Sequence, residues 1–550
     1  METTARDDGD DGLGPGPSTT QRGAAERSWL AARAAIVAAG TMLSRLLGLA
    51  RDVVLAALFR RDQTDAFFVA FAIPNALRQL LAEGAVASAV VPVLTETRAQ
   101  QGDDAARDLF QAVRGLWLVV LTVVTVLGIA FAPQLCDLFA AGWRSQPELF
   151  ARTVTLTRWV FAFIALMGSA ALGAAALNTH QRFAVPAFSP ALVNLAMVVF
   201  AWIAPEQLSA RGHDPTLAVA FGALMGGALQ VVVQWPALRK LGYLRRPLLQ
   251  LSHPGVREIV RRLMPLTIGM GVYFLIIASS RRLLSDLSEG AQSYFTWAFR
   301  LCALPQGVFI IALSTATLPS LARLVAAKDG PEVAKTYAYS MRLALFVALP
   351  ASTLLTVLAL PVVAAFFQRG QFGPEAARET AHSLMALALG IGPVAAIRQL
   401  VPVFYAHGDT RTPVLGTTVH LVVFLALAWW LRGSLGHVGI AAAFSGANAV
   451  QLLVMWALLR RRLPALRLGE IALSAGRTAV ACGGAALAGS VAADWISLPP
   501  IANGWQRLIL AAASSAIFCA TFVALAWLTR SDELRQLGAG LRRRLAPDRR

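Results

Sequence analysis

The sequence predicts an all-α polytopic membrane protein with about 14 transmembrane helices, arranged as two six-helix lobes plus two C-terminal helices. Of the 550 residues, 56% are hydrophobic and 15% are charged, whereas a soluble domain usually carries about 25% charged residues. Apolar runs of roughly 20 residues, the length that crosses a bilayer, recur along most of the chain. The two halves also share motifs at a fixed spacing.

The apolar runs define the expected spans, and the charges between them indicate the topology. Lys and Arg gather in segments that follow even-numbered spans, most strongly at 239–262, 460–467 and 530–550. The positive-inside rule then places both termini in the cytoplasm, which requires an even number of spans. The expected spans are 30–59, 65–94, 110–135, 152–178, 185–204, 215–238, 263–286, 291–322, 340–367, 376–406, 412–431, 438–459, 470–492 and 506–529.

An internal repeat relates the two halves. "NTHQRFAVP" places His180 and "YAHGDTRTP" places His407, 227 residues apart, and the same offset relates Pro92 to Pro319. Six spans per copy put both copies the same way up in the membrane. Two such lobes are typical of a transporter that opens alternately to each side. We interpret the two histidines as structural residues beside turns.

Domain boundaries follow from the spans and the repeat. We expect a disordered cytoplasmic tail at 1–26, lobes at 27–240 and 241–463, a two-helix unit at 464–530 and a basic cytoplasmic tail at 531–550. The formal net charge of +18 lies mostly in short loops, where topology accounts for it, so nucleic acid is not an expected partner. The four scattered cysteines form no metal-binding motif, and no metal or cofactor is expected.

Basic residues inside apolar segments are the strongest functional signal. Each Arg at the centre of a bilayer costs roughly 2.5–3.5 kcal/mol unless it faces water or a partner. A water-filled cavity between the lobes would remove that cost, whereas Arg281 fits a side chain that reaches the membrane edge. The arginines that we expect in the cavity are Arg45, Arg51, Arg78, Arg300 and Arg398.

Few acidic groups accompany these arginines in the sequence. Asp52 lies seven residues after Arg45, on nearly the same helical face, and Asn75, Gln79 and Glu83 form one polar stripe at intervals of four. Arg300 and Arg398 have no carboxylate nearby in sequence. The cavity should therefore be positively charged, and the forked donors of arginine suit a phosphate-bearing anion.

Several motifs resemble one bacterial family. The segments "SRLLGLARD", "TDAFFVAFAIPNALRQLLAEGAVASAVVPVL", "FRLCALPQGVFIIALSTATLPSLA", "FFQRGQFG" and "GDTRTPV" are similar to the lipid II flippases of peptidoglycan synthesis, the MurJ (MviN) family of the multidrug/oligosaccharidyl-lipid/polysaccharide exporter superfamily. The resemblance spans roughly 30–530. It implies fourteen helices in two lobes and export of an undecaprenyl-diphosphate-linked disaccharide-pentapeptide across the bacterial cytoplasmic membrane.

The resemblance also implies roles for particular residues. The arginines matching Arg45, Arg51, Arg78 and Arg300 line the cavity in the family, and Arg398 falls where relatives carry a basic residue. Acidic residues matching Asp65 and Glu83 are implicated in transport, which suggests cavity or gating roles for them beside Asp52. The last two helices would form a groove for the lipid tail. We expect a monomer that contacts membrane lipids and works with the cell-wall synthesis machinery.

The chain departs from the family at two places. Phe299 and Ala303 flank Arg300 where relatives carry acids, which leaves this arginine less compensated. Spans 263–285 and 412–431 contain no Asp or Glu, which speaks against the sodium site of some relatives and leaves the coupling ion or driving force open.

Three other functions compete with lipid II export. Export of another polyprenyl-diphosphate-linked oligosaccharide is the main alternative, because it needs the same cationic cavity. A cationic drug exporter would need carboxylates in the cavity. An enzyme would need catalytic carboxylates or metal ligands near a membrane face, and we expect none.

Overall fold

The structure is a computed structural model that describes residues 19–81, 85–463, 466–495 and 503–545. Helices are the only regular secondary structure in these ranges. The first helix begins at Thr19, so 19–26 are helical rather than part of the expected disordered tail. Ala, Arg and Glu in this stretch favour continuation of the first helix. Residues 1–18 lie outside the described ranges.

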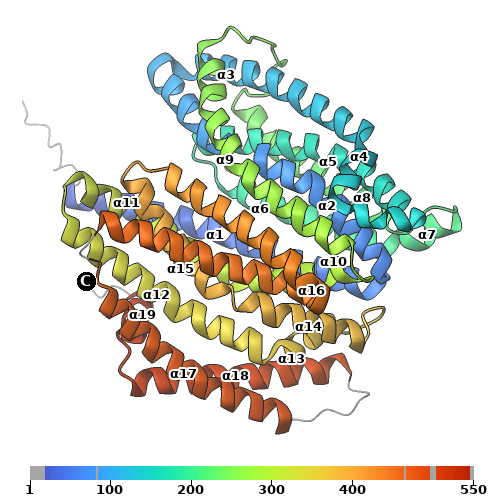
Figure 1. Cartoon of the computed structure of the whole chain (residues 1–550). Coiled ribbons are helices and arrows are strands. Elements are labelled where there is room, and N and C mark those ends of the chain that lie inside the picture. Colours follow the sequence, from blue (N-terminus) through green and yellow to red (C-terminus); the bar gives the residue numbers. More distant parts are fainter. Residues whose placement is uncertain (1–18, 82–84, 464–465, 496–502, 546–550) are drawn as a thin grey trace, which may run out of the picture.

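The first half of the chain forms one helical lobe (Figure 1). Helix α6 packs against α1 and α8, and α5 packs against α2, α3 and α8. Gly222 and Gly226 of α8 let the backbones of α6 and α8 approach, since a Cβ at Gly226 would lie 2.4 Å from the Cα of Val193. The elements are α1 (Thr19–Leu58), α2 (Arg61–Leu81), α3 (Ala85–Ala130), α4 (Ala132–Ala140), η1 (Ala141–Ser145), α5 (Pro147–Thr179), α6 (Ala184–Ile203), α7 (Pro205–Ala210) and α8 (Leu217–Lys240).

The second half forms another set of packed helices. Helix α15 packs against α11, α12 and α16, and α14 packs against α10, α13 and α16. Helix α9 joins the two halves, because it packs against α2, α3 and α4 as well as against α16. The elements are α9 (Pro254–Ser285), α10 (Ala291–Pro305), η2 (Gln306–Ile310), α11 (Ile311–Ala326), α12 (Gly330–Val357), α13 (Ala359–Phe367), α14 (Pro374–Ala388), α15 (Ile391–Ala406) and α16 (Arg411–Arg462).

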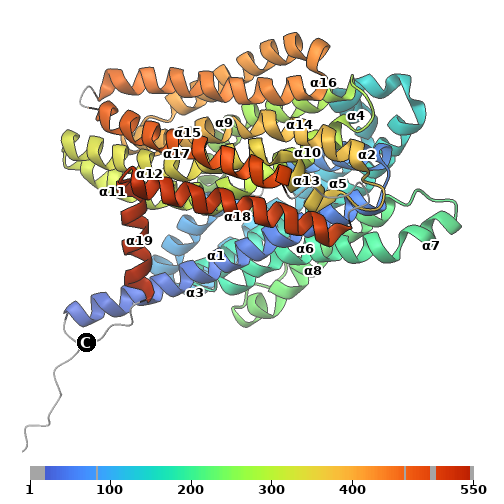
Figure 2. The ribbon, with the colours of Figure 1, turned by 90° about the horizontal axis from the view of Figure 1, so that it is seen from below.

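The C-terminal helices lie at one edge of the molecule (Figure 1). Helices α17 (Leu468–Trp495) and α18 (Gly504–Leu528) pack against each other, and then against α12 and α13 of the second half. Helix α19 (Asp532–Leu545) runs across the direction of α17 and α18 (Figure 2). The basic tail expected at 531–550 is therefore helical as far as Leu545.

Every expected span contains helix, but the helices are divided differently. In the described part of the chain, nine helices are long and apolar enough to cross a membrane. Helices α3 and α16 each contain two expected spans or parts of them, and they bend at Gly102 (φ 89°) and Gly436 (φ 55°). The expected span 291–322 divides into α10, the π-helical η2 and α11.

The repeated histidines occupy equivalent places in the fold. His180 ends α5 and His407 ends α15, with nearly the same backbone angles (φ −91°, ψ 15° and φ −85°, ψ 8°). The next residue has positive φ in both copies, 59° at Gln181 and 72° at Gly408. In each copy of the repeat the backbone then enters another long helix, α6 or α16. The sequence repeat therefore coincides with a repeat of local backbone geometry.

Candidate functional site

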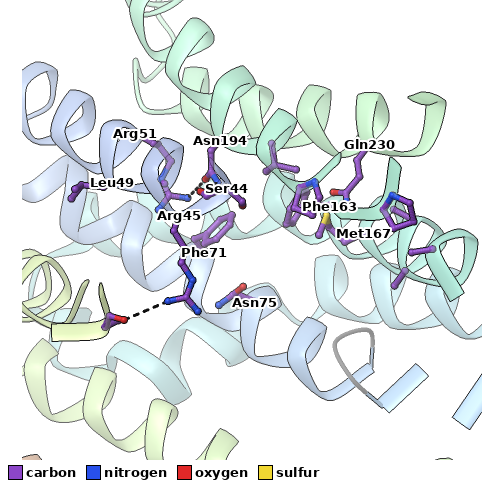
Figure 3. A pocket seen from close by; sticks show the side chains of 18 of the residues that line it. Ser44, Arg45, Leu49, Arg51, Phe71, Asn75, Phe163, Met167, Asn194 and Gln230 are labelled. Carbon is purple, nitrogen blue, oxygen red and sulfur yellow. Dashed lines mark hydrogen bonds between the residues drawn. The ribbon is translucent and has the colours of Figure 1, made fainter. Parts of the chain in front are cut away.

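A cavity of about 590 Å³ lies between the first lobe and α10 (Figure 3). Helices α1, α2, α5, α6 and α8 supply most of its wall, and α10 supplies Arg300, Ala303 and Leu304. Its charged lining residues are Arg45, Arg51, Asp52 and Arg300. Three arginines and one aspartate leave the wall with a positive balance. The amides of Asn75, Asn178, Asn194 and Gln230 add polar surface.

Asp52 holds two of these arginines together. It is 1% exposed and accepts hydrogen bonds from Arg51 Nε at 3.0 Å and Nη2 at 2.6 Å. Its other carboxylate oxygen lies 3.4 Å from Arg300 Nε, which forms an ion pair between α1 and α10. Arg300 therefore has a carboxylate partner, contrary to the expectation from its sequence neighbours. Asp52 pairs with Arg51 and Arg300 rather than with Arg45.

Asn194 of α6 fixes the position of Arg51. Its side-chain oxygen accepts a hydrogen bond from Arg51 Nη1 at 3.0 Å, and its amide donates to the Ser44 carbonyl at 3.0 Å (Figure 3). The guanidinium is thus held on one side by Asp52 and on the other by an amide that is itself oriented. A guanidinium whose donor groups are held in place in this way is suited to bind an oxyanion through two parallel hydrogen bonds. This role of Asn194 was not predicted from the sequence.

Arg45 reaches across to the second half of the chain. Its Nη1 lies 3.5 Å from the Ala303 carbonyl oxygen. A Cβ on Gly307 of η2 would lie 1.2 Å from the same Nη1, so the guanidinium occupies space that only glycine leaves open. Gly307 is thus a further residue beside the cavity that was not predicted from the sequence. Single π-helical turns between α-helical segments are frequent at functional sites.

The other predicted site residues are distributed differently. Asn75 lines the cavity. The side chains of Arg78 and Gln79, and all of Glu83, lie outside what the structure describes. Arg398 is exposed on α15 and is not among the residues lining this cavity, although it lies close enough to Arg45 for the two charges to interact.

Asp65 lies in a helix cap rather than in the lining of this cavity. It is 2% exposed and accepts hydrogen bonds from Gly290 N at 2.7 Å, Ser293 N at 2.8 Å and Ser293 Oγ at 2.5 Å. The first amides of α10 are unpaired within the helix, and a carboxylate satisfies them. Asp65 thus ties α2 to the start of the helix that carries Arg300.

Further contacts close the interface of the two halves at the same end. Gly370 (φ 56°) allows the next amide to reach α1, since a Cβ there would lie 2.2 Å from the Ala57 oxygen. The contacts are Gln371 N to Ala57 O at 2.9 Å, Arg61 to Glu375 at 2.8 Å, and Thr64 Oγ to Ser293 Oγ at 2.8 Å.

A second, smaller hollow adjoins the cavity. Its volume is about 180 Å³, and it shares Phe71, Asn75 and Arg300 with the first. Arg281 lies in its wall and donates to Gln292 Oε1 at 3.0 Å and Thr296 Oγ1 at 2.7 Å. The interpretation of Arg281 as a residue at the membrane edge is therefore wrong, because α9 turns it toward α10.

These features define the class of the protein. The chain is a multi-pass membrane protein whose two helical halves enclose a positively charged cavity closed at one end, as expected of a transporter of anionic ligands. Among the described residues, no group of three or more His, Cys, Asp or Glu side chains is arranged to hold a metal ion.

The family follows from comparison with known proteins. Residues 55–502 match the model of the family "Lipid II flippase MurJ". The chain is 33% identical to the lipid II flippase MurJ of Burkholderia cenocepacia over 90% of this chain and 97% of the relative. It is 34% identical to a probable lipid II flippase MurJ of Vibrio cholerae over 76% of this chain and 81% of the relative. The chain belongs to the lipid II flippase MurJ family, whose members are transporters rather than enzymes.

Solved structures support the fold. A structure described as lipid II flippase MurJ in an inward closed conformation aligns with a TM-score of 0.70 at 20% identity, covering 89% of this chain and 98% of that one. An inward-facing multidrug transporter of the MATE family aligns with a TM-score of 0.61 at 15% identity, covering 77% of this chain and 95% of that one. The expected likeness to the multidrug/oligosaccharidyl-lipid/polysaccharide exporter superfamily is confirmed at the level of the fold.

Proposed function

We propose that this protein moves lipid II, the undecaprenyl-diphosphate-linked disaccharide-pentapeptide, from the inner to the outer leaflet of the bacterial cytoplasmic membrane. The observation that carries the proposal is the positive cavity in which Arg45, Arg51 and Arg300 converge from both halves of the chain. Family membership identifies the substrate class, and the arginine geometry supplies the chemistry that recognises a diphosphate.

The diphosphate would bind between Arg51 and Arg300. Both guanidinium groups already lie beside the Asp52 carboxylate. A modest rearrangement of the two arginine side chains would therefore let both donate hydrogen bonds to one anion. Arg51 is 6% exposed and fixed by Asn194, whereas the Arg300 side chain is 46% exposed. Arg51 therefore serves as the fixed half of the site and Arg300 as the half that moves toward the ligand. Arg45 adds charge from the opposite side.

The remaining predicted residues have supporting roles in this proposal. Arg78 and Gln79 follow Asn75 on α2, and Glu83 follows them in the sequence. With Asn75, which lines the cavity, these residues would extend its polar wall. Arg398 would add positive charge near Arg45 when the halves move. Asp65 acts in gating, because the cap that it forms on α10 must break or tilt when this end of the interface opens.

Alternating access then follows from the topology. We infer fourteen spans with both termini in the cytoplasm, two six-span lobes at 27–240 and 241–463, and a lipid-tail unit at 464–530. Arg61, Gly290 and Gln371 lie in loops after odd-numbered spans, and Asp65 begins the span that follows the first of these loops, so their contacts would seal the outer end. The cavity of this state would open toward the cytoplasm, where lipid II is made.

Complementation tests the function directly. The gene is expressed in a strain depleted of its own lipid II flippase, and lipid II exposed on the outer leaflet is measured together with protein level. Restored growth with exposed lipid II supports the proposal. Growth failure at normal membrane expression, together with export of a different polyprenyl-diphosphate-linked glycan by the purified protein, would favour the alternative substrate.

A further inference from the structure

We propose that the smaller hollow beside the arginine cavity binds a single sugar ring, the one attached directly to the diphosphate. This inference rests on the proposed function, because it identifies a subsite for one part of that substrate. The hollow is built by α2, α9, α10 and α16. It shares Phe71, Asn75 and Arg300 with the arginine cavity, so a group covalently attached to a bound diphosphate can enter it.

Aromatic rings form much of the wall. Phe299 stacks on Phe295, with ring centroids 6.2 Å apart and an interplanar angle of 16°, and meets Phe444 edge-on at 5.7 Å. Phe299 is 39% exposed and Tyr273 is 41% exposed, although both line an internal hollow. Phe295, in contrast, is packed in the core at 6% exposed.

Such partly exposed rings suit a saccharide. The C–H face of a pyranose is apolar and flat, so it packs against an aromatic face, while its hydroxyl groups point outward to polar partners. Binding sites of this kind combine aromatic walls with a few well-placed polar groups. Rings that are already stacked against neighbours also lose little conformational freedom when a ligand binds.

Polar groups lie where the ring hydroxyls would need them. Arg281, Thr296, Ser280 and Asn75 line the same hollow. Arg281 is oriented by the hydrogen bonds to Gln292 and Thr296, so its guanidinium is held in place before any ligand arrives. An isoprene unit of the lipid tail could offer no hydrogen bond to the remaining donors of this guanidinium, which is unfavourable.

The size of the hollow limits the ligand to one ring. Its volume of about 180 Å³ lies below the range of roughly 300–1,000 Å³ that is usual for drug-sized ligands. The second sugar and the peptide would therefore remain in the larger cavity, near the amides of Asn178 and Gln230. The hollow distinguishes a sugar-linked polyprenyl diphosphate from the bare lipid diphosphate that remains after the sugar is removed.

Binding to purified protein in lipid nanodiscs tests this subsite. The probes are undecaprenyl diphosphate, the same lipid carrying N-acetylmuramoyl-pentapeptide, and lipid II. We expect Phe299→Ala and Tyr273→Leu each to weaken binding of both sugar-bearing lipids by up to about tenfold, since a lost aromatic contact is worth roughly 0.5–1.5 kcal/mol. Affinity for undecaprenyl diphosphate should stay within twofold of wild type.

Two further variants separate stacking from folding. Phe299→Leu keeps an apolar side chain but removes the flat ring, so it should lose the sugar preference as Phe299→Ala does. Tyr339→Leu on α12 is the matched control, because Tyr339 is similarly exposed at 46% and lines neither cavity. It should bind all three lipids like wild type.

The outcomes distinguish the subsite from the function. Equal loss of affinity for sugar-bearing and sugar-free lipids in the Phe299 and Tyr273 variants would overturn the sugar subsite. Equal affinity of wild type for all three lipids would overturn it as well, while leaving diphosphate transport intact. Wild-type protein that binds none of them would overturn the proposed function, and the subsite with it.

Discussion

Gly307→Ala should disable transport without unfolding the protein. The added Cβ would lie 1.2 Å from Arg45 Nη1, 2.1 Å from Cζ and 2.5 Å from Nη2. Non-bonded carbon contacts are usually about 3.5–4.0 Å, so the guanidinium must move by roughly 2 Å. Displacing a binding group by about 1 Å can cost on the order of 10²-fold in rate. We expect a loss of that order in lipid II flipping.

Stability should change little in this variant. The atoms that obstruct the new methyl group belong to the end of a flexible side chain, which can swing into the cavity. Alanine also favours helix over glycine by roughly 0.5–1 kcal/mol. Thermal unfolding in detergent and membrane abundance should therefore match wild type. Gly476→Ala on α17 is the matched control, because nothing lies within 4 Å of its added Cβ.

A double-mutant cycle identifies the cause. If Gly307 acts through Arg45, Gly307→Ala should add little to the loss already caused by Arg45→Ala. Flipping is measured by the amount of lipid II exposed on the outer leaflet at matched protein levels. Wild-type flipping by Gly307→Ala would refute the argument that the position of Arg45 matters, and fully additive losses would show that Gly307 acts separately.

Three further predictions concern charged residues in different parts of the molecule. Arg51→Ala should abolish flipping while the protein remains in the membrane. Arg51→Lys should keep only part of the activity, because a point charge cannot replace the guanidinium that is held between Asp52 and Asn194. Wild-type flipping by Arg51→Ala would contradict a cationic site. Asp65→Asn should lower thermal stability by about 1–3 kcal/mol through the weakened cap of α10, yet leave diphosphate binding intact; unchanged stability would contradict the capping role. Glu533→Gln should release α19 to proteases, because Glu533 accepts hydrogen bonds from Ser474 and Arg342. Burial acts to raise the pKa of Glu533, but hydrogen bonds from its own backbone amide, Ser531, Ser474 and Arg342 outweigh it and lower the pKa. Protection of wild-type α19 should therefore be present above the ordinary pKa of glutamate and be lost as the pH falls through this lowered value, and pH-independent proteolysis would count against the contact.

The sequence alone was enough to predict the transporter class. Long apolar runs require helices in a bilayer, because no water is present to satisfy an unpaired backbone. Arginines inside such runs must face a cavity or a partner, and of the predicted arginines Arg45, Arg51 and Arg300 line the cavity, whereas Arg398 does not and the side chain of Arg78 lies outside the described part of the chain. Helical periodicity likewise placed Asn75 on the polar face of α2.

What the tertiary structure decided is how these residues meet. Arg300 of α10 pairs with Asp52 of α1, which lies 248 positions earlier in the chain. Asp65 of α2 caps α10, which begins more than two hundred residues after Asp65. Arg281 is turned toward α10 by its hydrogen bonds to Gln292 and Thr296, and Gly307 leaves the space that Arg45 of the first half occupies. Periodicity and hydropathy constrain which face of a single helix carries charge, but they carry no information about the helix that faces it. That pairing depends on how the two lobes pack, which is set by side-chain shape summed over the whole interface.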